Sequence, residues 1–126
     1  MIMIGSFLKR GDNSGINHMR CIRVPGGSYK RYARMGHLIK VALKYLKNRR
    51  KLQKKKVYTA LIIGLRRKQS RNDGSFIKFD NNRAVLLSDK NKFIGSRIVG
   101  PLCKEMRGGK NEMRYKKIIS RAHGTV

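Results

Sequence analysis

The sequence predicts a small, mainly β domain, a β-barrel with a helical C-terminal appendage. Short apolar segments are separated by clusters of turn-forming residues, which is typical of barrels and sandwiches. Residues 38–45 alternate between apolar and mostly cationic side chains with a period of two, as in a half-buried strand. After Gly100-Pro101 the apolar spacing becomes helical. At 126 residues we expect a single domain, with the barrel over about 1–99 and the appendage over about 100–126.

The predicted strands cover residues 7–10, 19–24, 38–45, 57–65, 75–79 and 83–87. Turn formers at 11–15, 25–28 and 80–82 separate them, and Asp73-Gly74 is a strong hairpin signal. Residues 57–65 are almost continuously apolar, which indicates a strand buried on both faces. In 38–45, one face carries Ile39, Val41, Leu43 and Tyr45, and the other carries Lys40, Ala42 and Lys44.

Two short helices are predicted in the appendage. Pro101 suits the first position of a helix on which Leu102, Cys103 and Met106 share a face, and Gly108-Gly109 ends it. In a second helix over 113–122, Ile118 and Ile119 would pack against the rest of the protein.

The charge is the most informative property of the composition. Thirty-two Lys and Arg stand against 6 Asp and Glu, a net charge of +26. Such a chain repels itself, so we expect a polyanionic partner, most commonly nucleic acid. The hydrophobic fraction of 40% is nevertheless sufficient for a core, unlike that of a disordered basic tail.

Several functional classes are disfavoured by the same sequence. The acidic residues stand in turns or on exposed helical positions, with no pair placed for acid–base work, so we expect no enzyme. No apolar run approaches the length of a membrane span, and the first four residues are too short for a signal peptide. Cys21 and Cys103 stand alone and are expected to be buried thiols, so we predict no metal and no cofactor.

Two segments predict contacts with RNA. Residues 29–34 interleave basic and aromatic side chains, so cations would meet phosphates and tyrosines would stack on unpaired bases. The alternative is a solvated loop with its tyrosines packed on the barrel. Residues 47–56 hold seven basic residues in ten, and here the alternative is a solubilising or nuclear-import patch. His37 is expected to be an exposed polar residue, with an RNA contact as the alternative.

Read in order, these segments closely resemble the large-subunit ribosomal protein L-fourteen family, and the match runs nearly end to end. The residues that carry it are Asp12-Asn13-Ser14-Gly15, Cys21-Ile22-Arg23-Val24, Gly26-Gly27-Ser28, Arg31-Tyr32-Ala33, Asp73-Gly74-Ser75, Phe79-Asp80, Val85-Leu86-Leu87, Ile94-Gly95-Ser96-Arg97-Ile98, Gly100-Pro101 and Lys117-Ile118-Ile119-Ser120. Each tetrapeptide is a weak signal, but the ordered set is highly specific.

The resemblance implies a five-stranded barrel with a C-terminal loop and short helices. It implies a structural component of the large ribosomal subunit that binds large-subunit rRNA at the subunit interface. The implied partners are small-subunit rRNA at an intersubunit bridge, neighbouring large-subunit proteins and a ribosome-silencing factor.

Four departures from the family pattern stand out. His37 replaces the usual Asp, and Arg83 replaces the usual Ala. The Lys47–Lys56 run replaces a Pro/Gly-containing loop, and residues 121–124 lack the acidic, Pro-bearing close. Most departures add positive charge, as in divergent organellar ribosomal proteins, and the likeness begins near residue 1. We therefore expect a mitochondrion-encoded protein bound to ribosomes in the matrix, with a plastid or bacterial origin as the alternative.

The rRNA footprint is predicted to be built from basic loops, with Ser28 and Tyr32 among the contacts. Its predicted residues are Arg20, Arg23, Ser28, Lys30, Arg31, Tyr32, Arg34, Lys40, Lys44, Arg49, Arg50, Lys51, Lys54, Lys55, Lys56, Arg66, Arg67, Lys68, Arg71, Arg97 and Arg107. A nucleoid protein on DNA, a free RNA chaperone and a membrane-active cationic protein are the alternative classes.

Overall fold

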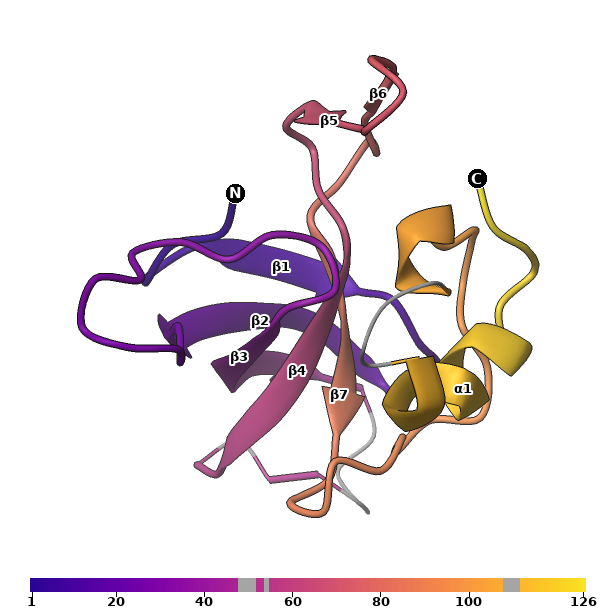
Figure 1. Cartoon of the computed structure of the whole chain (residues 1–126). Helices are drawn as coiled ribbons and strands as arrows, with labels where there is room; N and C mark the ends of the chain where they lie inside the picture. Colours follow the sequence, from indigo (N-terminus) through magenta and orange to yellow (C-terminus); the bar gives the residue numbers. More distant parts are fainter. Residues whose placement is uncertain (48–51, 54, 108–111) are drawn as a thin grey trace.

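The protein is a closed five-stranded β-barrel with a C-terminal segment packed against one side (Figure 1). The computed structural model describes residues 1–47, 52–53, 55–107 and 112–126. The barrel is formed by β1 (Phe7–Arg10), β2 (Ile16–Arg23), β3 (Leu38–Leu46), β4 (Val57–Gly64) and β7 (Arg83–Leu87). The predicted fold class and the five-stranded barrel are confirmed.

The strands follow one another around the barrel as antiparallel neighbours, and a single parallel pairing closes it. β1 pairs with β2, β2 with β3, β3 with β4 and β4 with β7, all antiparallel. Lys9 and Arg10 of β1 then pair in parallel with Arg83 and Ala84 of β7. Closure leaves no open barrel edge for another chain to pair with.

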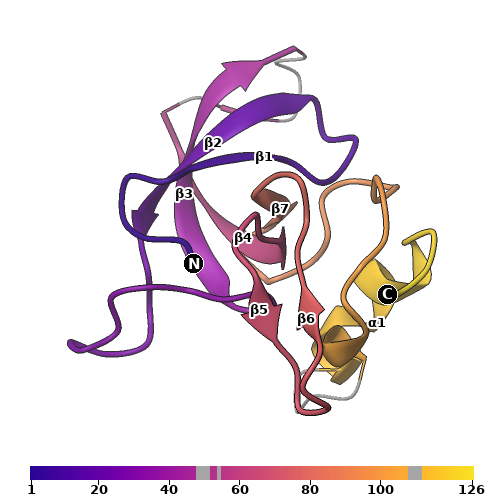
Figure 2. The ribbon, with the colours of Figure 1, turned by 90° about the horizontal axis from the view of Figure 1, so that it is seen from above.

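The predicted strand over 75–79 is not part of the barrel. Its residues contribute β6 (Phe76–Ile77), which pairs with β5 (Gln69–Ser70) and with no other strand of the described ranges. Asp73 closes the turn between them, because its Oδ1 accepts hydrogen bonds from the Ser75 N–H at 2.9 Å and from the Ser75 hydroxyl at 2.5 Å. The Asp-Gly hairpin signal was therefore correct, and the hairpin projects from the end of the barrel (Figures 1 and 2).

The continuous apolar run of β4 is explained by two hydrophobic clusters, one on each of its faces. Ala60 and Ile62 point into the barrel interior, whereas Leu61 and Ile63 belong to an outer cluster. β7 alternates in the same way. The outer cluster is completed by residues of the C-terminal segment, among them Ile98, Leu102, Met106, Tyr115 and Ile118. Burial of β4 on both faces was predicted and is confirmed.

In its described residues, the C-terminal segment contains one α-helix, α1 (Glu112–Ser120), and one turn of 3₁₀ helix, η1 (Lys104–Met106). The predicted helix after Pro101 is thus wrong in type and length. Leu102 and Cys103 are extended instead, because Leu102 exchanges backbone hydrogen bonds with the chain end: its N–H donates to Gly124 and its carbonyl accepts from Val126. Both side chains are still buried, as expected. No helix in the described part of the chain is long and apolar enough to cross a membrane.

Tyr45 departs from the alternation predicted for its strand. Ile39, Val41 and Leu43 are buried as predicted, but Tyr45 is exposed and Leu46 packs on the barrel interior. Register shifts in β2 opposite this end of β3 change which side chains face inward. Tyr45 instead meets His18 across the strands in an edge-to-face contact, with ring centroids 5.8 Å apart.

Asp12 is the buried acidic residue of the described chain and fastens the start of the first turn to β7. Its Oδ1 accepts hydrogen bonds from the Ser14 hydroxyl at 2.6 Å and from the Ser14 N–H at 3.3 Å. Its Oδ2 accepts one from the Leu86 N–H at 3.4 Å. The turn role was predicted, but the burial was not. Burial raises the pKa of Asp12, against the hydrogen bonds from Ser14 and Leu86, which lower it.

Candidate nucleic-acid interface

The loop between β2 and β3, residues 24–37, is fastened to the N-terminus at one point. Ile2 and Ala33 exchange backbone hydrogen bonds of 2.9 and 2.8 Å, and both side chains are fully buried. Because Ala33 is held inward, its neighbours Tyr32 and Arg34 are exposed, with the guanidinium of Arg34 5.9 Å from the Tyr32 ring centroid. Ser28 and Arg31 are also exposed, and Lys30 is partly so.

Tyr29 is the most exposed large hydrophobic side chain of this loop, at 96%. The alternative in which the loop's tyrosines pack on the barrel therefore fails for Tyr29, and Tyr32 is 41% exposed. Aromatic faces beside arginines and lysines are the arrangement on which unpaired bases stack.

His37 closes the loop where it enters β3. Gly36 adopts a φ of +82°, a conformation that favours glycine, and its N–H donates to the Ile62 carbonyl at 2.9 Å. The Nδ1 of His37 then accepts a hydrogen bond from the Arg34 N–H at 3.3 Å. The expectation of an exposed His37 is thus corrected, because the ring is partly buried and accepts a hydrogen bond from within the loop.

The outer face of β2 and β3 carries the next group of predicted contacts. Arg20, Arg23, Lys40 and Lys44 are all exposed. Arg23 lies directly opposite Lys40 in the sheet register. Like charges in this position repel each other and destabilise the strand pair unless an anion neutralises them. Lys40 also donates to the Thr59 hydroxyl at 2.6 Å, and the Arg20 guanidinium lies 5.7 Å from the ring centroid of the exposed Phe7. Sequence reasoning missed Phe7, because its exposure depends on which face of β1 turns outward.

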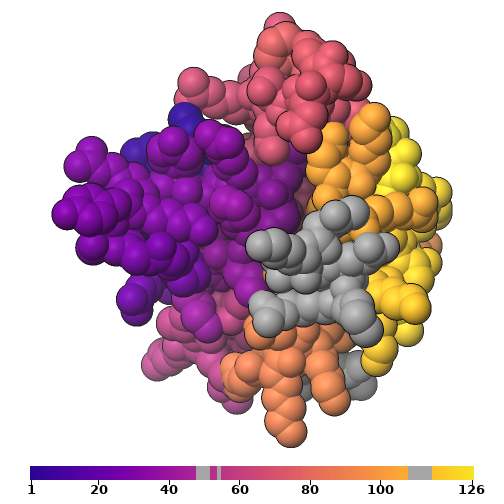
Figure 3. All heavy atoms as spheres, viewed as in Figure 1, coloured from indigo at the N-terminus to yellow at the C-terminus, as the bar shows by residue number. Residues whose placement is uncertain are grey.

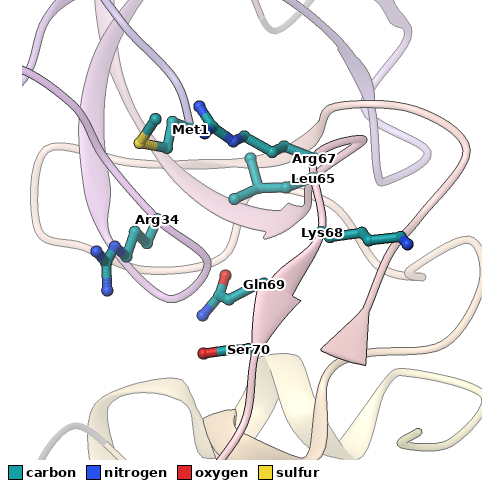
Figure 4. A pocket seen from close by; sticks show the side chains of 7 residues that line it. All are labelled: Met1, Arg34, Leu65, Arg67, Lys68, Gln69 and Ser70. Atoms are coloured by element: carbon teal, nitrogen blue, oxygen red, sulfur yellow. The ribbon is translucent and has the colours of Figure 1, made fainter. Parts of the chain in front are cut away.

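A third group follows β4, where Arg66, Arg67 and Lys68 are exposed on the way to the hairpin. Arg67 and Lys68, together with Arg34 of the β2–β3 loop, border a cleft of about 220 Å³. Figure 4 shows its lining, which comprises Met1, Arg34, Leu65, Arg67, Lys68, Gln69 and Ser70. Figure 3 shows the loop at the left of the molecule and the hairpin at its top. Gln69 and Ser70 carried no signal in the sequence, because the folded hairpin alone places them near Arg34.

The remaining predicted contacts are dispersed. Lys55, Arg97 and Arg107 are exposed. Lys56 forms an exposed ion pair with Asp89 at 3.1 Å and lies 5.6 Å from the Tyr58 ring centroid. Arg49, Arg50, Lys51 and Lys54 lie outside the described residues.

Arg71 differs from the other predicted contacts because its guanidinium is used within the chain. Its Nε lies 2.8 Å from Glu105 Oε1 in an ion pair, and its Nη2 donates to the Val126 carbonyl at 2.6 Å. The Arg71 side chain is only 14% exposed. It ties the turn of the hairpin to the C-terminal segment.

The chemistry of the interface is that of a binding surface. Cys21 and Cys103 are free, buried thiols, as expected. In the described ranges, no three His, Cys, Asp or Glu side chains gather as a metal site would require. The exposed functional groups are overwhelmingly guanidinium and ammonium, which suit phosphates.

The fold and the interface define a small β-barrel protein whose loops concentrate positive charge. Its sequence matches the family model of ribosomal protein L14p/L23e over residues 1–126. The chain therefore belongs to this ribosomal protein family, and the resemblance inferred from its turns is confirmed. Family membership makes it a structural constituent of the large ribosomal subunit, located on the ribosome.

Proposed function

We propose that this protein binds large-subunit rRNA through its basic loops and outer strand face, at the interface with the small subunit. The observation that carries the proposal is the exposure of three separate groups of cations on the described surface, two of which border one cleft. The β2–β3 loop, the outer face of β2 and β3, and the segment after β4 supply Arg31, Arg34, Lys40, Arg67 and their neighbours. Membership of a ribosomal protein family supports rRNA as the polyanion.

The footprint itself comes from electrostatics and shape. Arginine and lysine contacts to phosphate fix the position of the protein but carry little sequence information. Specificity would then come from the shape of the folded rRNA and from 2′-hydroxyls, with Tyr29 and Tyr32 available to stack on unpaired bases. The basic run over 47–56, with Arg49, Arg50, Lys51 and Lys54, would extend the footprint.

Further partners follow from the resemblance. We expect contacts with small-subunit rRNA at an intersubunit bridge and with neighbouring large-subunit proteins. The C-terminal segment would be the docking surface for a silencing factor, although residues 121–124 differ there from the family pattern. The added positive charge favours a mitochondrial ribosome over a plastid or bacterial one.

The salt dependence of rRNA binding tests the footprint. Lys30→Ala combined with Arg31→Ala should weaken binding and reduce the slope of log K against log salt by about 0.7–0.9 per lost phosphate contact. The matched control removes two exposed lysines of α1, Lys116 and Lys117, which lie outside the predicted footprint. Replacing Arg49, Arg50 and Lys51 by Ala applies the same test to the central basic run. Equal slopes for the loop and control variants would remove the β2–β3 loop from the footprint.

Sedimentation tests the cellular assignment. A lysate is run on a sucrose gradient at moderately high salt, and the chain is located by mass spectrometry. We expect about one copy per large subunit, because many phosphate contacts keep the protein bound at that salt concentration. Recovery on DNA, with release by deoxyribonuclease, would support the nucleoid alternative. Recovery on free RNA would support a chaperone instead.

A further inference from the structure

The cleft between the β2–β3 loop and the start of the hairpin offers two kinds of interaction to one ligand. Its volume of about 220 Å³ is several times the roughly 30 Å³ that one water molecule occupies in the liquid. Arg34 borders it from the loop and Arg67 from the segment after β4. Figure 4 shows Arg67 reaching over the cleft, with Lys68 directed away from it. The lining residues include no acid in the part of the chain that the structure describes.

Gln69 supplies the second kind of interaction. Its Oε1 is buried, and no group among the described residues donates a hydrogen bond to it. The residue is held in place because its backbone pairs with Ile77 across the β5–β6 hairpin. Figure 4 shows the Gln69 and Ser70 side chains projecting from β5 toward the side of the cleft that Arg34 borders. An unsatisfied buried acceptor is costly, so a ligand that donates a hydrogen bond there would be favoured.

The two requirements together select a ligand. The arginines require anionic oxygens, and the Gln69 oxygen requires a donor close beside them. A ribonucleotide carries both, because its 2′-hydroxyl lies near the backbone phosphate. A deoxyribonucleotide has the phosphate but lacks this donor.

We propose that this cleft binds one ribose-phosphate unit of RNA, with Arg34 and Arg67 on the phosphate and Gln69 Oε1 accepting a hydrogen bond from the 2′-hydroxyl. The proposal rests on the proposed rRNA-binding function and adds a specific site to it. Most of the predicted footprint is cationic and would hold any nucleic-acid backbone. Gln69 is the residue that makes the surface distinguish RNA from DNA.

The experiment compares two duplexes of about 16 base pairs with identical sequence, one of RNA and one fully 2′-fluoro-substituted. Both keep the A-form, but the second lacks the hydroxyl donor. The full chain is titrated against each by fluorescence anisotropy over a series of salt concentrations. We expect it to bind the RNA duplex about five- to tenfold more tightly, the usual effect of one hydrogen bond.

Three variants separate the roles. Gln69→Leu should reduce RNA affinity to that for the fluoro duplex and leave the salt slope unchanged. Gln69→Glu keeps an acceptor, so it should keep the preference for RNA while weakening both complexes through repulsion of phosphate. Arg67→Ala should weaken both complexes by the same factor and lower the slope by about 0.7–0.9. Circular dichroism of each variant confirms that the barrel remains folded.

Two results would overturn the inference while rRNA binding stands. One is equal affinity of the unmodified chain for both duplexes, and the other is an equal loss on both duplexes in Gln69→Leu. Failure of the unmodified chain to bind either duplex or intact large-subunit rRNA would overturn the proposed function, and the inference with it.

Discussion

The Nδ1 atom of His37 accepts a hydrogen bond from the backbone N–H of Arg34 at 3.3 Å, and the His37 N–H returns one to the Arg34 carbonyl at 3.2 Å. This reciprocal pair closes the turn that presents Arg34 at the edge of the cleft. Nδ1 can accept only while the ring nitrogen carries no proton. Burial, with the charges of Lys30 and Arg34, lowers the pKa of His37 from its usual 6.5 and keeps it neutral.

The turn at Arg34 should therefore loosen in acid. Because the pKa of His37 is lower in the folded state than in the unfolded state, its contribution to stability is complete above pH 6.5. That contribution is lost as pH falls through the folded value. We expect the Arg34 amide to lose protection from hydrogen exchange below that value, measured by NMR. His37→Gln should abolish the pH dependence, and persistence of the dependence in that variant would assign it to another group.

Asp12→Ala should destabilise the barrel. The substitution leaves the Leu86 N–H without its acceptor in a buried position, at a cost of about 1–3 kcal/mol in the free energy of unfolding. Urea unfolding measures this loss, and Ser14→Ala, which keeps the Leu86 bond, is the milder control. A loss in Asp12→Ala no larger than that in Ser14→Ala would show that the Leu86 contact contributes little.

The pH dependence of this loss has a definite sign. The pKa of Asp12 is higher in the folded state, so its favourable contribution is complete below its unfolded value of about 3.8 and declines as pH rises through the folded value. The difference between the unmodified chain and Asp12→Ala should therefore be larger in acid than at neutral pH. A difference that grows with rising pH would contradict the raised pKa.

The barrel could be predicted from the sequence because period-two patterns and turn residues act locally. The strand bounds at 7–10 and 83–87 match β1 and β7, and the apolar run of β4 indicated the second hydrophobic layer. The failures all arise from contacts between distant segments. The 3₁₀ turn at Lys104–Met106 follows from backbone pairing of Leu102 with the chain end, and Tyr45 is exposed because of register shifts in β2.

The candidate interface likewise contains residues that could be predicted from the sequence and residues that only the fold reveals. The cationic contacts could be predicted from composition, because Lys and Arg side chains are normally exposed and their role does not depend on where the fold places them. Gln69 was not, since one polar residue in a basic segment carries no signal until the hairpin places it beside Arg34. Arg71 resembles its neighbours in the sequence, and only the fold shows its ion pair with Glu105.

Arg83 should act as a clamp between the barrel and the C-terminal segment. Its guanidinium donates to the carbonyls of Val99 at 2.5 Å and Pro101 at 3.1 Å and lies 5.2 Å from the Phe79 ring centroid. Arg83→Ala should lower the free energy of unfolding by about 1–2 kcal/mol, because both carbonyls lose a charged donor.

Arg83→Lys tests whether the forked geometry matters. Lysine keeps the charge but lacks the planar pair of donors, so we expect an intermediate stability in urea. Hydrogen exchange at residues 98–102 should increase in the order unmodified chain, Arg83→Lys, Arg83→Ala. Unchanged exchange in Arg83→Ala would place the stabilising contacts of this segment elsewhere.

Arg71 and Arg97 should behave oppositely although both belong to the predicted footprint. Arg71 is mostly buried and paired with Glu105, whereas Arg97 is exposed. Arg71→Ala should lower the free energy of unfolding by about 1–2 kcal/mol, because it strips partners from Glu105 and from the Val126 carbonyl. Arg97→Ala should stay within about 0.5 kcal/mol of the unmodified chain.

In rRNA titrations the order reverses: Arg97→Ala should reduce the salt slope by about 0.7–0.9, while Arg71→Ala leaves it unchanged. A reduced slope in a fully folded Arg71→Ala variant would show that its guanidinium leaves Glu105 to meet phosphate in the ribosome.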